Sequence, residues 1–443
     1  MIFFYFVQIG VMTAAVAFSW LRFRHVLHPH FIFSVVMFVH YSDFFVRGYD
    51  DLSLELIDPA NLIVYQMLTL ACFALPIFIT GLWQHKDMTA SLNSVRDFGQ
   101  IGRGAGGYAL LIAVLFILIE MLKRLYLSDW SPSWVFEQML GPRNERQWVP
   151  SLLARDLESE QIVSNPFFQL ISALFPIAAI ITAFSMIYSS TAVRVVSFIV
   201  YLFAVFILLT DGTRTPIVLA IASLTIFALL KFQSIGARVA IAGLGVGLIV
   251  IATSVMILFR SEGYSELLQS RRDYGVTYHQ DDSIYRAWYA YDRASKTDYR
   301  WDPGYFAFTV AATPVPRAIW PDKPFLSQAY FGPFKLDYVT ILFLGEFVAM
   351  FGVVGGTFAG FLYCILVYRL WLSFAPLLGR PFGLVGYLFW ALWVYSLFRS
   401  VQNLSLLIYA PVAATLLILW IGKIMRTDRP AIGNKGPSNA ARI

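Results

Sequence analysis

Charged residues are scarce in this chain of 443 residues. They make up 14% of the sequence, while hydrophobic residues make up 58%. Soluble domains carry roughly 25% charged residues, so this balance excludes an ordinary soluble globular protein. Apolar runs of about 17 to 25 residues, the length that a helix needs to cross a bilayer, recur along nearly the whole chain. The composition therefore predicts an all-α polytopic membrane protein.

Several familiar cofactor motifs are also missing. The two cysteines, Cys72 and Cys364, both fall in apolar stretches, so neither a disulfide framework nor a thiolate metal site is indicated. No Gly-rich loop ends in Gly-Lys-Ser/Thr, so ATP is not expected as the energy source. His25, His28 and His30 cluster, but no acid or cysteine lies near them, and we expect a wet interfacial loop rather than a zinc site. No cofactor and no metal are therefore predicted.

Eleven apolar segments are long enough to be considered as membrane helices. They lie near residues 2–21, 30–46, 61–83, 107–125, 166–189, 193–210, 215–231, 239–259, 341–371, 382–398 and 402–422. The first has no basic leader or cleavage pattern and is expected to be a retained helix. The ninth contains several glycines and is expected to be tilted or broken.

The charges between these segments predict an orientation. With the N-terminus outside, the inner segments hold 15 Lys/Arg and three acids, and the outer segments hold 18 Lys/Arg and 24 acids. Short inner loops are then the basic ones, as the positive-inside rule requires. The pI near 9.1 thus reflects orientation, and no nucleic-acid partner is expected. Residues 1–426 are predicted to be one transmembrane domain with outer loops 126–165 and 260–339, and residues 427–443 a disordered cytoplasmic tail.

The loop at residues 260–339 is the most distinctive stretch of the chain. It contains ten Lys/Arg, ten Asp/Glu and eighteen aromatic residues. A polar, aromatic loop on an apolar body is where function is usually found.

Within this loop, residues 281–296 fit an amphipathic helix. Trp288 lies on its apolar face and Arg293 on the opposite one. Such a helix can lie in the membrane interface, and its rings can stack on sugar faces. The alternative is an interfacial aromatic belt, in which the rings serve only as anchors.

Basic residues recur on the predicted outer side. Arg214, Arg260 and Arg399 lie at the outer ends of predicted helices, and Arg317 and Lys323 flank Trp320 in the Pro-rich stretch 316–324 of the large loop. Charge at membrane depth is costly without a partner, and guanidinium forks match the oxygens of phosphates and diphosphates. We therefore expect a diphosphate-binding cavity at the outer ends. The alternative is that these side chains snorkel to lipid headgroups.

The same side of the chain has acid–base capacity. Glu346 or His279 could accept a proton from a hydroxyl nucleophile, and Asp322 lies in the same loop. Glu346 could equally be a structural partner of an arginine. Glu120 and Lys123 share a helix face and are expected to pair with each other.

Three segments carry a resemblance to a known family. They are Asp211-Gly-Thr-Arg-Thr-Pro-Ile217, Pro316-Arg-Ala-Ile-Trp-Pro-Asp-Lys-Pro324, and Leu344-Gly-Glu through Phe351-Gly-Val-Val-Gly355. Together with one dominant late loop, they make the chain resemble the Wzy-type polysaccharide repeat-unit polymerases, which build O antigen, enterobacterial common antigen and exopolysaccharide.

The resemblance implies a fold, a location and a reaction. It implies a glycosyltransferase-C-like membrane protein of the bacterial inner membrane, with a periplasmic N-terminus and a cytoplasmic C-terminus. A growing glycan on undecaprenyl diphosphate would be transferred to a new lipid-linked repeat unit, without a metal. Besides membrane lipid, a chain-length regulator and a flippase are implied partners.

The resemblance also implies site residues. The implied catalytic residues are Arg214, Arg317, Glu346 and His279. The implied diphosphate- and glycan-binding residues are Arg260, Lys323, Arg399, Asp322, Arg293, Trp288 and Trp320.

Three alternatives remain open at the level of sequence. An O-antigen ligase would use the same donor with lipid A core as acceptor. A transporter of lipid-linked sugars would place charges deep in several helices. A scaffold of an envelope assembly complex would have no catalytic residue at all.

Overall fold

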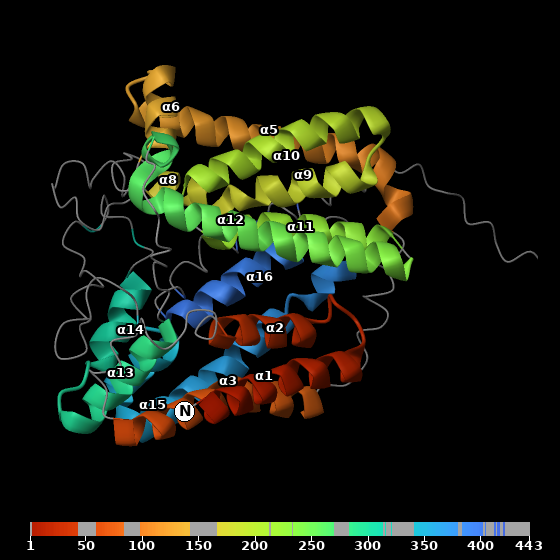
Figure 1. The fold of residues 1–443 in the computed structure, drawn as a ribbon. Coiled ribbons are helices and arrows are strands. Elements are labelled where there is room, and N and C mark those ends of the chain that lie inside the picture. Colours follow the sequence, from red (N-terminus) through yellow and green to blue (C-terminus); the bar gives the residue numbers. More distant parts are fainter. Residues whose placement is uncertain are drawn as a thin grey trace, which may run out of the picture.

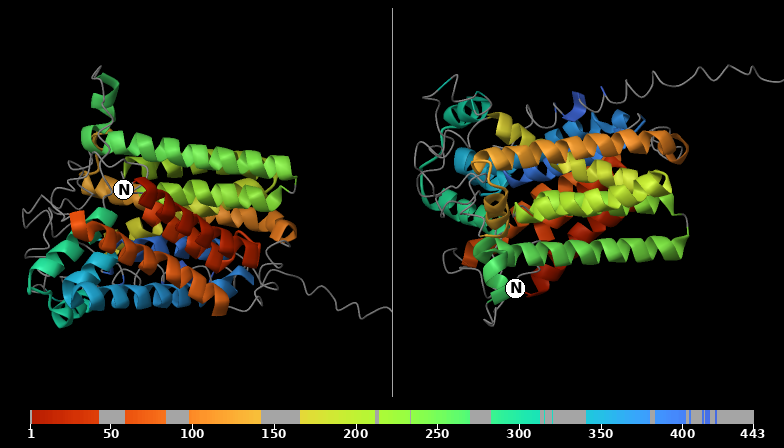
Figure 2. Two further views of the ribbon diagram at one scale, coloured as in Figure 1. Left: turned by 60° about the horizontal axis from the view of Figure 1, so that its bottom comes forward. Right: turned by 90° about the horizontal axis from the view of Figure 1, so that it is seen from above.

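The computed structural model describes residues 2–42, 59–83, 98–141, 166–211, 214–232, 234–269, 283–312, 341–379 and 383–401, with a few isolated positions beyond these ranges. Every regular element in this part of the chain is a helix, which confirms the all-α prediction. The long helices run side by side along one direction (Figures 1 and 2).

Within the described residues, six helical stretches are long and apolar enough to cross a membrane. They are Phe6–Phe23, Asn61–Trp83, Leu170–Tyr188, Thr191–Thr210, Ile235–Ala252 and Phe343–Leu378. Shorter apolar helices occupy Pro29–Tyr41, Pro216–Lys231 and Gly383–Arg399. These helices support a polytopic membrane protein. The count of eleven spans and the orientation of the termini stay predictions.

The helices form two groups with one helix between them (Figure 1). The first group contains α5 (Phe98–Leu127), α8 (Pro166–Leu174), α9 (Pro176–Tyr188), α10 (Thr191–Thr210), α11 (Arg214–Lys231) and α12 (Ile235–Gln269). The second contains α1 (Ile2–Phe23), α2 (Pro29–Ser42), α3 (Pro59–Trp83) and α15 (Phe343–Leu372). Helix α16 (Gly383–Arg399), which follows the short 3₁₀ helix η5 (Ala375–Gly379), contacts α9 and α11 on one side and α2 and α15 on the other.

Three shorter helices gather at one end of this bundle, which we call the crown end (Figure 1). They are α6 (Pro132–Leu140), α13 (Ser283–Lys296) and α14 (Pro303–Ala312). The turn between α10 and α11 lies at the same end, while the α9–α10 and α11–α12 connections lie at the opposite end. The crown end is the one that the sequence predicts to face outward.

Buried and exposed helices alike carry mainly apolar side chains, as expected of a protein that is surrounded by lipid. Residues 176–185 of α9 are all buried, so α9 is the central helix of its group. Helix α12 instead exposes large apolar side chains such as Val239, Leu244 and Ile251. So broad an apolar surface is unfavourable in water, and lipid is the environment that suits it.

Helix α15 is broken and folds back on itself. Gly352 has φ 74° and ψ −177°, a backbone conformation that glycine tolerates and that ends regular helix. The ring of Phe343 lies 5.5 Å from that of Tyr363, although twenty residues of straight helix would separate them by roughly 30 Å. A methyl group on Gly360 would lie 2.6 Å from Leu344. Residues 343–351 therefore pack antiparallel to the segment that follows Gly352, as the two arms of a hairpin.

The short arm of this hairpin begins deep in the bundle. Phe343, its first residue, has its ring 5.7 Å from that of Phe73, which lies near the middle of α3. By length alone α15 would cross a membrane once, but the fold-back means that only its second arm continues in that direction. The sequence prediction of a tilted or broken ninth segment is confirmed, and the break is a reversal.

Contacts from α13 and its linker hold the turn of the hairpin. The guanidinium of Arg300 lies over Gly352, where an added methyl group would be 3.4 Å from its Nε and Nη2. The same guanidinium donates to the carbonyls of Ala294 and Thr297, at 3.0 and 2.6 Å, and so closes the C-terminal end of α13. The N–H of Trp301 donates to the Ala349 carbonyl at 3.0 Å. That carbonyl has lost its regular helical partner at the break, so this bond satisfies it.

The histidine cluster differs from its prediction as a wet loop. His28 and His30 are buried, with exposed fractions of 2% and 0%. The ring of His30 bonds to the Ser19 hydroxyl and to the Ile77 carbonyl, both at 2.7 Å. Burial, together with the nearby His30 and His25, lowers the pKa of His28 to about 3. The cluster therefore stabilises the junction of α1, α2 and α3 as neutral side chains.

The fold-back makes Gly356 the most demanding position in α15. A methyl group there would lie within 2.5 Å of the Val348 nitrogen, which belongs to the backbone of the opposite arm and cannot move aside cheaply. We expect Gly356→Ala to destabilise the protein by about 1–3 kcal/mol, as overpacking does. Thermal unfolding of the purified protein in detergent measures this change.

Gly243 in α12 is the matched control, because nothing lies within 4 Å of a methyl group added to it. Gly243→Ala should raise stability by about 0.5–1 kcal/mol through helix propensity. Equal shifts for the two variants would contradict the hairpin.

Candidate functional site

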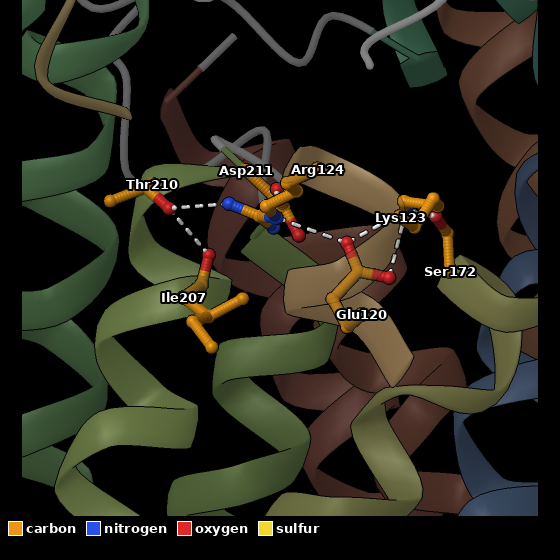
Figure 3. A network of polar contacts seen from close by, with 7 residues as sticks. All are labelled: Glu120, Lys123, Arg124, Ser172, Ile207, Thr210 and Asp211. Carbon is orange, nitrogen blue, oxygen red and sulfur yellow. Dashed lines mark hydrogen bonds and ion pairs between the residues drawn. The ribbon is translucent and has the colours of Figure 1, made fainter. Parts of the chain in front are cut away.

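Four charged side chains form a buried network at the crown end (Figure 3). Arg124, near the end of α5, is fully buried and donates from Nε to Glu120 at 3.1 Å and from Nη2 to Asp211 at 2.6 Å. Lys123 bonds to Glu120 at 2.7 Å and to the Ser172 hydroxyl on α8. Two cations thus face two carboxylates, and the formal charges cancel. Neutrality of this kind is what makes buried charges tolerable.

The network reaches the turn that links α10 to α11. Asp211 caps the C-terminal end of α10, where the helix dipole disfavours a carboxylate. Arg124 compensates for this, and its Nη1 also donates to the Thr210 hydroxyl at 3.3 Å. The Thr210 hydroxyl in turn donates to the Ile207 carbonyl at 2.8 Å. The fork of one guanidinium therefore holds two successive residues at the start of the turn.

Two of the predicted cationic residues begin or lie within helices of this group. Arg214 is the first residue of α11, three positions after Asp211, so its backbone starts directly from the turn. Arg260 lies within α12, towards the end of that helix. The structure describes the backbone of these two residues and not their side chains.

Four further predicted site residues lie outside the described residues: Arg317, Lys323, Asp322 and His279. Of the Pro-rich stretch, Trp320 is described, and its ring is half-buried and 5.8 Å from that of Phe308 on α14. This contact places Trp320 against α14 at the crown end.

Glu346 contacts the two residues that directly follow Arg399 in the chain. Glu346, in the first turn of α15, is fully buried. One of its oxygens accepts from the Ser400 hydroxyl at 2.6 Å, and the other accepts from the Val401 N–H at 2.7 Å. Arg399 immediately precedes these two residues, as the last residue of α16, and is half-buried. A hydroxyl and a backbone amide thus donate to Glu346, which links the start of α15 to the residues that follow α16.

The apolar face of α13 lies against protein. Trp288 is fully buried, and its indole N–H donates to the Thr69 hydroxyl of α3 at 3.2 Å. Tyr291 is also fully buried, and its hydroxyl is 2.7 Å from that of Thr357 on α15. The predicted helix is confirmed, but this face packs on α3 and α15 and is not presented to lipid or to a sugar. Arg293, on the other face, is half-buried and stacks over the ring of Tyr289 at 4.8 Å.

Arg124 is the functional candidate that sequence reasoning missed. The pairing of Glu120 with Lys123 was predicted from their spacing and is confirmed. The same spacing places Arg124 four residues after Glu120, which was a usable signal. Its partner Asp211 lies 87 positions away, and no local pattern connects the two.

Comparisons with known proteins add no family: no family model, no curated protein and no solved structure matches the chain. Among the described residues, no group of three or more His, Cys, Asp or Glu side chains is placed to hold a metal ion. The candidate site therefore rests on its own geometry, which consists of the Arg124 network, the turn before Arg214, and the junction around Glu346.

Replacing Glu346 separates its structural role from a catalytic one. In Glu346→Gln, the amide oxygen can accept from the Val401 N–H while the NH₂ donates to the Ser400 hydroxyl. We expect this variant to unfold within a few degrees of the wild type. Glu346→Ala should be less stable by about 1–3 kcal/mol, because it leaves buried donors without an acceptor. Thermal unfolding in detergent provides the comparison, and equal losses in the two variants would argue against the linking role.

Proposed function

We propose that the protein is a glycosyltransferase that polymerises lipid-diphosphate-linked oligosaccharide repeat units at the outer face of a bacterial inner membrane. The crown end is the proposed site, with the N-terminus on the same side. The observation that carries the proposal is the Arg124–Asp211 ion pair, because it holds the turn from which Arg214 starts α11. A functional residue needs support of this kind, because packing and hydrogen bonds from its neighbours must hold it in a productive geometry.

The reaction makes specific demands on the site. A hydroxyl oxygen of the acceptor sugar bonds to the anomeric carbon of the donor, and the bond from that carbon to the diphosphate oxygen breaks. Undecaprenyl diphosphate leaves with the bonding electrons, and the hydroxyl proton passes to a base. Cations must therefore stabilise the charge that develops on the diphosphate. We assign this task to Arg214, together with the basic residues Arg260, Arg317, Lys323 and Arg399.

The sequence offers two candidates for the base, Glu346 and His279. Glu346 already accepts hydrogen bonds with both oxygens, which supports a structural role for it. Activity of Glu346→Gln decides between them. Retained turnover assigns the proton to His279, whereas loss of turnover at an unchanged unfolding temperature assigns it to Glu346.

The hairpin of α15 favours a second candidate, a transporter of lipid-linked sugars. Broken helices that begin at mid-depth are typical of the substrate sites of transporters. The two functions differ in what they do to a substrate. A transporter moves a labelled lipid-linked glycan between leaflets of a proteoliposome and leaves its length unchanged, whereas a polymerase lengthens it without moving it.

Turnover of purified lipid-linked repeat units in vitro tests the proposal through Arg214. Arg214→Ala should lose at least about a hundredfold in kcat, the range that removal of a transition-state donor produces. Arg214→Lys should recover only part of this loss, because an ammonium does not reproduce the guanidinium fork. Product length on a gel and release of undecaprenyl diphosphate measure both effects.

Arg238 is a matched control at the opposite end of the bundle. It lies in the first turn of α12, is exposed and donates to the Phe232 carbonyl at 2.9 Å. Arg238→Ala should leave turnover unchanged.

In a deletion strain, single repeats attached to the lipid A core indicate a polymerase, and unattached lipid-linked polymer indicates a ligase. Unaltered product length in Arg214→Ala would remove the basis of the proposal.

A further inference from the structure

The Arg124 network carries one more inference, which rests on the proposed role of Arg214. We propose that Arg124 and Asp211 are positioning residues: their ion pair sets the α10–α11 turn and thereby directs Arg214 towards a diphosphate. Neither residue contacts the substrate in this proposal.

The geometry explains why a positioning device is needed at this turn. Only residues 212 and 213, a glycine and a threonine, separate the cap of α10 from the first residue of α11. Glycine is the most permissive residue of the backbone, so a Gly-Thr sequence does not by itself dictate one path between two helices. A misplacement of about 1 Å at a reacting centre can cost a hundredfold in rate.

The Arg124–Asp211 ion pair is well suited to fix the start of the connection from α10 to α11. Arg124 is fully buried on α5, and α5 packs closely against α9, the central helix of the group. Its fork bonds to Asp211 and to Thr210 at once, which fixes direction as well as distance. Glu120 holds the fork from the other side at Nε. Asp211 keeps 24% of its side chain exposed, so the network ends at the surface of the turn.

Charge balance allows positioning to be separated from stability. Asp211→Asn or Arg124→Gln alone leaves an uncompensated buried charge, whereas the two together restore neutrality to the cluster. The double variant should therefore recover most of the unfolding temperature that each single variant loses. It should not recover the rigidity of the turn, because two neutral amides do not replace a forked ion pair.

A spin label on the turn reports its rigidity directly. The two natural cysteines, Cys72 and Cys364, are both buried, so a cysteine introduced as Thr213→Cys can be labelled selectively in the full-length protein. The label should be strongly immobilised with the natural pair in place. Its mobility should rise at least about twofold in Asp211→Asn, in Arg124→Gln and in the double variant. Should Asp211→Asn fail to fold, Arg124→Lys, which keeps the charge and loses the fork, takes its place.

Lys123→Met is the matched control, since it removes a charge from the same cluster on the side facing α8, away from the turn. It should lower the unfolding temperature and leave the label immobile. In the turnover assay, without the label, the double variant should still lose about ten- to a hundredfold in kcat/KM.

The outcomes distinguish the two proposals. An immobile label in Asp211→Asn, or turnover that recovers together with the unfolding temperature in the double variant, overturns the positioning role. A label that behaves as expected in a protein that never extends a lipid-linked glycan supports a rigid turn and refutes the proposed function.

Discussion

The structure depends on one constraint: inside an apolar body, a charge or a backbone polar group is costly unless it finds its partner within the protein. Water is not available there to satisfy a stray carbonyl or carboxylate. Arg124 and the three charged side chains around it meet this constraint, because their two positive and two negative charges lie within a few ångströms of one another. The broken helix α15 meets it by recruiting Trp301 from the α13–α14 linker to bond to a carbonyl that the break has freed.

The same constraint determines where irregular backbone can occur. The turn of the α15 hairpin is covered by Arg300, and its deep end is closed by the bonds from Ser400 and Val401 to Glu346. The α10–α11 turn is supported by Arg124 from a third helix. At the α15 break and at the end of α10, a charged side chain from another part of the chain thus contacts the place where regular helix ends. A catalytic centre would use the same arrangement, in which polar atoms are held rigidly next to an apolar wall.

Sequence reasoning reached the parts of this arrangement that are local. Long apolar runs predicted most of the described helices, and helical spacing predicted that Glu120 pairs with Lys123. Glycines indicated that the ninth segment would break, since its residue 352 needs a positive φ. Each of these signals lies within a single turn or a single helix.

The remainder depends on contacts between distant segments. The reversal of α15 follows from how closely Gly356 approaches Val348, which composition does not encode. The burial of Trp288 depends on how α13 packs against α3 and α15, whereas helical periodicity alone presents its ring as a surface on which a sugar could stack. Likewise, Arg124 was overlooked because its decisive partner is on another helix, 87 positions away.

The guanidinium of Arg300 has a mechanical consequence. This guanidinium binds the end of α13 and also covers Gly352. It therefore links α13 to the turn of a hairpin whose other end lies in the interior. The short arm of that hairpin is about 13 Å long. It runs from the Gly352 turn, which Arg300 covers, to Phe343 in the interior. A displacement of α13 would therefore act on this arm, which carries Phe343 and, one turn along, Glu346.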